Sequence, residues 1–185
     1  MIRAFLAIQP AENVLQSLEA LQVELGETGA DARWVRREAM HLTIQFLGDV
    51  RENELPQIQS GLGEALCEQQ PFEIECRGLG VFPNQKRPRV VWVGLRGEGL
   101  VRLAERTETV LSPLGFPPEE RDLTPHITLG RVRSMRGWEG LQRVLKVSGE
   151  RSFGSSTIDH ATLYRSELRP DHAVYTVIAE FPFAR

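Results

Sequence analysis

The stretches His-Leu-Thr-Ile at residues 41–44 and His-Ile-Thr-Leu at residues 126–129 decide how this chain folds. Residues i and i+2 of a β-strand point to one face of the sheet, so His41 and Thr43 would lie together while the apolar residues beside them anchor the other face. The same alternation brings His126 and Thr128 together. We therefore expect two strands, each presenting one imidazole and one hydroxyl.

A third tetrapeptide, His-Ala-Thr-Leu at residues 160–163, has the same pattern, so its position along the chain has to decide which two belong together. Residues 2–77 predict the order strand, helix, motif strand, helix, strand, and residues 89–168 predict the same order again. This order indicates a diverged internal duplication in which His41 and His126 occupy matching places. His160 lies in the closing strand of its half, so we interpret it as a partly exposed or core-edge residue.

The 185 residues, with 41% hydrophobic content, suffice for a single domain with a real core. Helices alternate with strands, and the expected class is α+β. The stretch 78–89 is rich in Gly, Pro and Asn and predicts a long exposed loop between two lobes. We place the lobes at roughly residues 1–80 and 88–185 of one domain spanning 1–185, and leave open an exchange of the chain ends between them.

Composition excludes several classes of protein. No apolar run approaches the length of a membrane span, and the opening residues are too short an apolar run for a signal peptide. Cys67 and Cys76 form neither a close metal-ligand pair nor a disulfide framework, so we expect a cytoplasmic protein without membrane association. The formal net charge of −3 argues against bulk coating of nucleic acid, so any RNA contact must be local.

Two histidines on matching strands can serve as an acid and a base on opposite sides of a phosphodiester. An imidazole titrates at about pH 6.5, so a neutral and a charged ring can coexist near neutrality. The neutral ring would take a proton from an attacking water, the charged ring would give one to the departing oxygen, and the threonine hydroxyls would donate to the non-bridging oxygens.

Two alternatives compete with this acid–base hypothesis. A zinc site would require more ligands, because catalytic zinc usually has three protein ligands and no Cys or carboxylate lies at a telling spacing. A structural role would suit either histidine taken alone, but the matched pair in a repeat argues against it. We therefore expect no metal and no cofactor.

Several segments resemble one known family. HLTIQFLG at 41–48 and PHITLGR at 125–131 look like the paired His-x-Thr-x signatures of the two-histidine (2H) phosphoesterase superfamily, in its bacterial and archaeal branch of 2′-5′ RNA ligases and RNA 2′,3′-cyclic phosphodiesterases. RAFLAI near the start, GLGVFP at 78–83, RVVWVGL at 89–95 and LYRSEL followed by Tyr175 also resemble that branch, so the likeness covers nearly the whole chain.

The resemblance implies a bilobal α+β fold with an antiparallel sheet in each lobe and flanking helices, and an active-site groove between the lobes. It also implies opening of a 2′,3′-cyclic phosphate on RNA to a 2′-phosphate, with neither metal nor ATP. The reverse reaction would be 2′-5′ ligation. Carried over by position, His41 is the proton donor, His126 is the proton acceptor, and Thr43 and Thr128 bind the phosphate.

The resemblance further implies that Phe46 and Arg131, each five places after a motif histidine, hold the nucleobase. A base between a ring and a guanidinium is physically sensible. In a regular strand, however, a residue five places on points to the opposite face. A twist or a bulge is therefore required, and Gly48 and Gly130 are placed where one could occur.

Ends of RNA with a 2′,3′-cyclic phosphate, tRNA fragments among them, and small cyclic nucleotides would all present the same phosphate. We expect a monomeric enzyme acting on one of these. The alternative is a non-catalytic protein that binds RNA ends or nucleotides in the same groove, and the two intact motifs argue against it.

Overall fold

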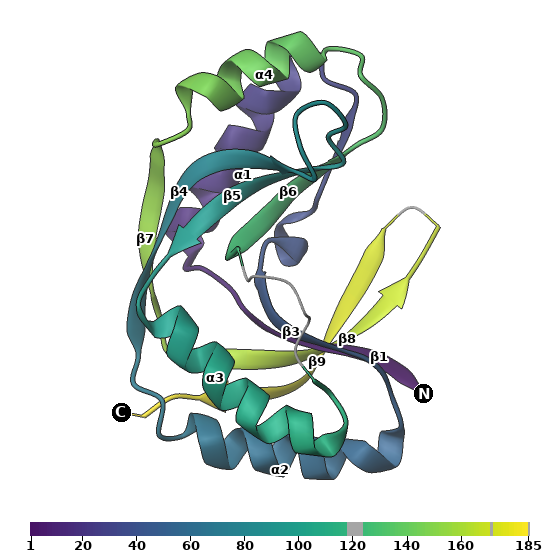
Figure 1. Ribbon diagram of the computed structural model, residues 1–185, viewed down its shortest axis with the longest axis vertical. Helices are drawn as coiled ribbons and strands as arrows, with labels where there is room; N and C mark the ends of the chain where they lie inside the picture. Colours follow the sequence, from purple (N-terminus) through teal and green to yellow (C-terminus); the bar gives the residue numbers. More distant parts are fainter. Residues whose placement is uncertain (118–123, 171, 185) are drawn as a thin grey trace.

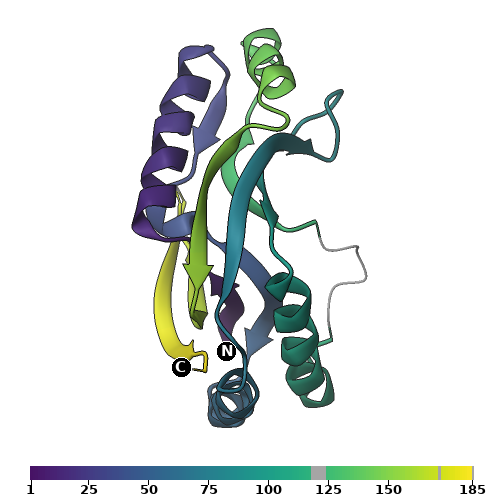
Figure 2. The same ribbon diagram turned by 90° about the vertical axis from the view of Figure 1, so that its left-hand side faces the viewer.

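The computed structural model describes residues 1–117, 124–170 and 172–184. It contains two antiparallel sheets with helices packed against each, which confirms the expected α+β class. Each sheet with its helices forms one lobe, and the two lobes lie one above the other in Figure 1 and are seen from the side in Figure 2.

The first lobe is built on a four-stranded sheet in the order β3-β1-β8-β9. Its strands are β1 (Ile2–Ile8), β3 (Leu42–Val50), β8 (His160–Leu168) and β9 (Ala173–Pro182). β1 lies between β3 and β8, and its run of consecutive buried residues follows from that central position. Helices α2 (Leu55–Leu66) and α3 (Gly99–Leu111) pack on each other and against β9 and β3.

The second lobe is built on a five-stranded sheet in the order β2-β6-β5-β4-β7. Its strands are β2 (Ala32–Trp34), β4 (Phe72–Phe82), β5 (Val90–Arg96), β6 (His126–Val132) and β7 (Ser152–Ile158). Helix α1 (Glu12–Glu27) packs on β7, and α4 (Trp138–Val147) lies beside α1 at the far end of the same lobe (Figure 1). The buried residues of α1 recur at helical spacing, as an amphipathic helix on a sheet requires.

The lobes do not coincide with the two halves of the sequence. Strand β4 extends to Phe82, so residues 78–82 of the stretch expected to be a loop are strand, and β4 pairs with β5 as one hairpin of the second sheet. A division at roughly 80–88 is therefore wrong for the sheets, because a Gly- and Pro-rich loop marks a hairpin turn as readily as a lobe boundary. Strands β8 and β9 pair with each other along their length as a hairpin of the first sheet.

An exchange of elements between the halves explains this arrangement. The fourth strand of the first half, β4, lies beside β5 in the second sheet, and β8 of the second half lies beside β1 in the first sheet. The first helix of each half also packs on the other lobe, α1 on the second and α3 on the first. The two sheets thus have matching orders, β3-β1-β8-β9 and β6-β5-β4-β7, with β2 added at the edge.

Candidate active site

His41 lies between η1, a 3-10 turn over Arg37–Ala39, and the start of β3. Its ring stacks on Phe5 of β1 with 4.9 Å between the ring centroids and 25° between the planes. The Tyr175 ring from β9 is nearly perpendicular to it, with 5.2 Å between centroids, and the Tyr164 ring from β8 stacks at 6.0 Å between centroids. Three other strands of the first sheet therefore enclose the imidazole in aromatic rings, while part of its surface stays open to solvent.

This enclosure changes the protonation of His41. Desolvation among the rings lowers the pKa of His41 to about 4, and a hydrogen bond to the Glu38 backbone opposes the shift only in part. A charged imidazolium loses hydration in such a setting, which favours the neutral ring. The His41 ring of the free protein is therefore neutral at neutral pH.

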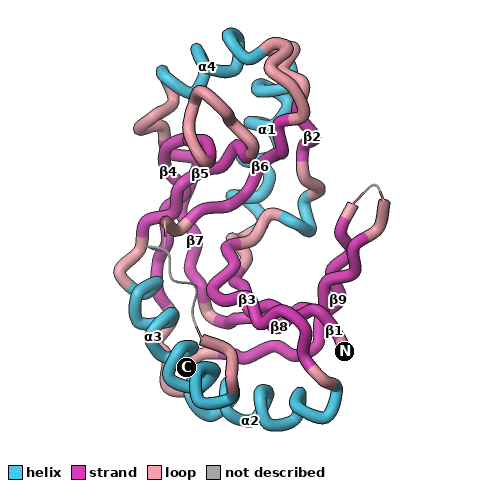
Figure 3. Tube along the Cα trace, turned by 45° about the vertical axis from the view of Figure 1, so that its right-hand side comes forward, coloured by secondary structure: helices cyan, strands magenta, loops and turns pink. Residues whose placement is uncertain are grey.

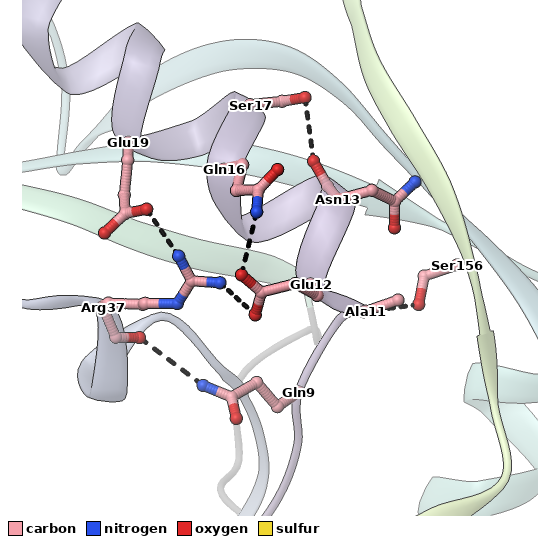
Figure 4. A network of polar contacts seen from close by, with 9 residues as sticks. All are labelled: Gln9, Ala11, Glu12, Asn13, Gln16, Ser17, Glu19, Arg37 and Ser156. Carbon is pink, nitrogen blue, oxygen red and sulfur yellow. Dashed lines mark hydrogen bonds and ion pairs between the residues drawn. The ribbon is translucent and has the colours of Figure 1, made fainter.

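The turn that leads to His41 is tied to helix α1 of the other lobe, as Figure 4 shows. The Arg37 guanidinium pairs with the carboxylate of Glu12 and, at 2.6 Å, with that of Glu19. The Gln9 amide donates to the Arg37 carbonyl at 3.5 Å. Because Glu12 and Glu19 belong to α1, these contacts fix the approach to the first motif against the second lobe.

His126 begins strand β6 and is held by a backbone group. Its Nδ1 lies 2.8 Å from the Thr124 carbonyl oxygen. A carbonyl can only accept, so Nδ1 carries a proton and donates it, which leaves the Nε2 lone pair of the neutral ring available. Phe82 of β4 packs edge-on at 4.9 Å and Trp92 of β5 lies at 6.1 Å between centroids.

Each motif threonine shares a face with its histidine through the pairing of the strands. Thr43 lies opposite Ala7 of β1, two residues from Phe5, whose ring touches His41. In the second sheet, Thr128 lies opposite Trp92, and His126 lies opposite Gly94. The expected grouping of His41 with Thr43 and of His126 with Thr128 agrees with this register.

Phe46 reaches the same face because β3 has a bulge. Leu6 pairs with Gln45 and Ala7 pairs with Thr43, so Ile44 is the extra residue and the alternation reverses there. Phe46 then lies opposite Phe5, 5.9 Å away between ring centroids, and is 50% exposed. The expected position of the bulge at Gly48 is wrong for this reversal, which occurs before Phe46.

Arg131 is turned in the same way. Trp92 pairs with Thr128 and Val91 pairs with Gly130, so the extra residue is Leu129, next to the predicted Gly130. Arg131 then lies opposite Val90, on the face of Trp92, and its side chain is exposed. A parity argument alone would place both residues on the wrong faces.

The two motif faces interact across the lobes. β3 of the first sheet and β6 of the second sheet contact each other, where the two lobes meet in Figures 1 and 3. Burial raises the pKa of Tyr175 on β9, and the positive charge of Arg131 on β6 opposes this shift in part. The second-lobe guanidinium therefore lies near the aromatic rings around His41.

His160 lies apart from this arrangement, as expected from the order of elements. It is exposed at the start of β8, and its Nδ1 lies 2.7 Å from the Asp159 carboxylate. Thr162 is buried. The pattern of the third tetrapeptide is thus that of an ordinary strand.

Sequence reasoning missed the rings that surround the two histidines. Phe5, Tyr164 and Tyr175 come from strands far apart in the sequence, as do Phe82 and Trp92. Their only signal is an aromatic residue at an alternating position of a predicted strand, which is equally typical of core packing.

Two properties of the described residues bear on the classes considered above. In the described part of the chain, no helix is long and apolar enough to cross a membrane. Over the same ranges, no three His, Cys, Asp or Glu side chains gather in a way that could hold a metal ion.

Comparison with known proteins assigns the family. The chain belongs to the family described as LigT like Phosphoesterase, whose sequence profile matches residues 8–92 and again residues 93–175. The expected membership of the 2H phosphoesterases is thereby confirmed. The double match also agrees with the internal duplication inferred from the order of elements.

Relatives extend over the whole chain. An RNA 2′,3′-cyclic phosphodiesterase of Methanothermobacter thermautotrophicus is 35% identical over 181 residues, which is 97% of this chain and 98% of the relative. A protein of the same name from Archaeoglobus fulgidus is 36% identical over 182 residues, 97% of this chain and 99% of the relative. The crystal structure of TT0787 of Thermus thermophilus superposes with a TM-score of 0.83 at 30% identity and covers 98% of this chain and 97% of that one.

Proposed function

We propose that this protein is an RNA 2′,3′-cyclic phosphodiesterase that opens a terminal 2′,3′-cyclic phosphate to a 2′-phosphate. The observation that carries the proposal is the His126 ring, whose Nδ1 is bonded to the Thr124 carbonyl so that Nε2 can accept a proton. A second His-x-Thr motif lies on the facing lobe. Full-length relatives that bear the name of this activity support the same assignment.

In the proposed reaction His126 is the proton acceptor. Its Nε2 takes a proton from a water whose oxygen forms the new bond to phosphorus. The bond from phosphorus to the 3′ oxygen breaks, and His41 gives a proton to that leaving oxygen. Thr43 and Thr128 donate hydrogen bonds to the non-bridging oxygens, where charge develops in the transition state.

The lowered pKa of His41 sets a condition on this mechanism. A proton donor has to be charged before it acts, and the enclosed His41 ring of the free protein is neutral at neutral pH. An anionic phosphate beside the ring favours the imidazolium, so substrate binding would raise the pKa of His41. His41 would therefore acquire its proton together with the substrate.

Phe46 and Arg131 are the proposed contacts to the nucleobase. Both side chains reach the motif faces through bulges, and both are exposed. A ring and a guanidinium can each stack on any base, so this pair would bind the terminal nucleoside without strong sequence preference.

The proposed substrates are RNA ends with a 2′,3′-cyclic phosphate, including tRNA fragments, and small cyclic nucleotides. Reverse 2′-5′ ligation would use the same groups. The reaction would require neither metal nor ATP, because the two imidazoles supply the proton transfers. We place the protein in the cytoplasm as a monomer, and the free thiols of Cys67 and Cys76 are compatible with a reducing compartment.

The direct test is incubation with an oligoribonucleotide ending in a 2′,3′-cyclic phosphate, in EDTA and without ATP. We expect conversion to a 2′-phosphate, identified by the resistance of the end group to a 3′-phosphatase and by mass. A 3′-phosphate product would contradict the direction of ring opening. Binding without turnover would favour the non-catalytic alternative, and activity lost in EDTA and restored by zinc or manganese would contradict the histidine mechanism.

A further inference from the structure

A pocket lined by three arginines lies outside the site described above. It has a volume of about 280 Å³ and lies between the β4–β5 loop and the loop that follows β6, which run side by side in Figures 1 and 3. Its lining consists of Arg87, Pro88, Arg89, Val132, Arg133, Ser134 and Met135. We refer to it as the arginine pocket.

The three guanidinium groups of this pocket lack carboxylate partners among the described residues. Many of the other arginines of the described ranges pair with Asp or Glu, for example Arg37, Arg77 and Arg151. Within those ranges, Arg87, Arg89 and Arg133 form no ion pair.

A nearby carboxylate, Asp31, is engaged elsewhere. It accepts a hydrogen bond of 2.6 Å from Ser134 and lies 3.8 Å from Arg136. Exposed cations that no described carboxylate pairs with repel one another, and an anionic ligand would relieve that repulsion.

The pocket continues directly from the proposed active site. Arg131 lies opposite Val90, and at the next step the Val132 N–H donates to the Arg89 carbonyl at 3.0 Å. Arg133 is two residues beyond Arg131, a distance of roughly 7 Å along an extended strand. A polymer whose end lies at Arg131 can therefore reach the pocket with its adjoining units.

The chemistry of the lining suits a nucleotide backbone better than a lone inorganic ion. Arginine presents a planar fork of donors that matches phosphate oxygens. Met135 is 50% exposed at the same pocket and offers apolar surface to a ribose or a base. A positively charged groove that follows the backbone is common to proteins that bind single-stranded nucleic acid.

We propose that the arginine pocket is a second phosphate-binding site, which holds the backbone of single-stranded RNA upstream of the terminal cyclic phosphate. This inference rests on the proposed function for the position of the RNA end. It adds that affinity depends on the length of the strand, so an oligonucleotide binds more tightly than a cyclic mononucleotide.

The test compares a 2′,3′-cyclic mononucleotide with a ten-residue oligoribonucleotide ending in a cyclic phosphate, using the full-length protein and the double variant Arg89→Gln/Arg133→Gln. We expect KM for the oligonucleotide to rise about tenfold, with kcat unchanged and with both constants for the mononucleotide unchanged. The salt dependence of oligonucleotide binding should weaken, with the slope of log K against log salt falling by about 1.4 for two lost phosphate contacts.

The matched control is Arg102→Gln/Lys146→Gln, which removes the same charge from exposed positions on α3 and α4. This control should leave kcat and KM for both substrates within about twofold of the values for the unaltered protein. A phosphate contact is local, and distant charges are screened. An equal rise in oligonucleotide KM for the control would attribute the effect to net charge and overturn the proposal.

Binding of a 3′-hydroxyl oligoribonucleotide, followed by fluorescence anisotropy, separates this proposal from the proposed function. If the unaltered protein turned over neither substrate but the pocket variant bound RNA more weakly, the proposed function would be contradicted and the proposed phosphate-binding site would be supported. If it turned over both substrates and the pocket variant behaved as the unaltered protein, only the pocket proposal would fail. Displacement of the RNA by polyglutamate of equal charge, as effectively as by unlabelled RNA, would also overturn it.

Discussion

The two motif histidines follow nearly the same sequence pattern but lie in different surroundings. His41 is enclosed by Phe5, Tyr164 and Tyr175 and is desolvated, and its pKa falls to about 4. His126 is bonded through Nδ1 to a backbone carbonyl. Residues of neighbouring strands thus place two similar tetrapeptides in different surroundings, and acid–base chemistry with two like groups requires such a difference.

The largest effect should come from removing either ring. His41→Ala and His126→Ala should each lower kcat/KM on a cyclic-phosphate oligonucleotide by at least about a hundredfold, the usual contribution of a general acid or base. His160→Ala is the matched control, and its kcat/KM should stay within a few fold of that of the unaltered protein, because His160 is exposed beside Asp159. Equal damage from all three would break the comparison between the paired motifs and the third tetrapeptide.

The pH dependence of the rate should show which histidine is the proton donor and which is the proton acceptor. One ring has to be neutral and the other charged, so the rate should fall in acid and in alkali. His41 lacks its proton in the free protein and would gain it with substrate, so the alkaline limb of kcat/KM should lie at least about one pH unit below that of kcat. His41→Ala should lose the alkaline limb and keep the acid limb.

The measurement is a pair of pH series for kcat and kcat/KM on the unaltered protein and the two histidine variants. A flat profile between about pH 5 and 9 would rule out histidine acid–base catalysis. Loss of the alkaline limb in His126→Ala instead would reverse the two roles. The apparent pKa values belong to the coupled pair, so the variants are needed to assign them.

The aromatic enclosure should account for the lowered pKa of His41. Tyr175→Ala would let water reach the edge of the ring, so the pKa should rise by about one unit toward its usual value. The pKa can be followed by NMR titration of the ring protons. Val177→Ala on the same strand, at a side chain that is 51% exposed, serves as the control and should leave the titration unchanged.

The same enclosure should make stability depend on pH. The pKa of His41 is about 4 in the folded protein and about 6.5 in the unfolded chain, so the unfolded state binds the proton first as the pH falls. The free energy of unfolding should therefore decrease from about pH 6.5 to pH 4 by roughly 3 kcal/mol, and this contribution should level off below pH 4.

Urea unfolding at a series of pH values tests this linkage. His41→Phe should flatten the dependence over that window, whereas His160→Phe, at an exposed ring, should retain it. An unchanged slope in His41→Phe would place the proton uptake on another group.

The order of elements up to α4 and the matching of His41 with His126 could be predicted because apolar alternation and helical spacing are local properties of the chain. The single closing strand expected for the second half is instead two strands, β7 and β8, in different sheets. The partners of β4 and β8 could not, since strand exchange depends on contacts between residues far apart in sequence. The sequence indicates that each motif strand needs a bulge, because Phe46 and Arg131 would otherwise point to the face opposite the motif histidines. It does not indicate that the extra residues are Ile44 and Leu129. The setting of His41 depends on Tyr164 and Tyr175, more than 120 residues later in the chain.

The exchange of β4 and β8 has a consequence for the origin of the site. In a chain consisting of one repeat, the last strand would belong to a sheet that this chain alone could not complete. Two such chains could complete both sheets by exchanging that strand in a symmetric dimer. Both histidines of that dimer would lie in identical surroundings by symmetry. In one continuous chain this constraint is absent, so substitutions in β8 and β9 can change the surroundings of His41 without changing those of His126.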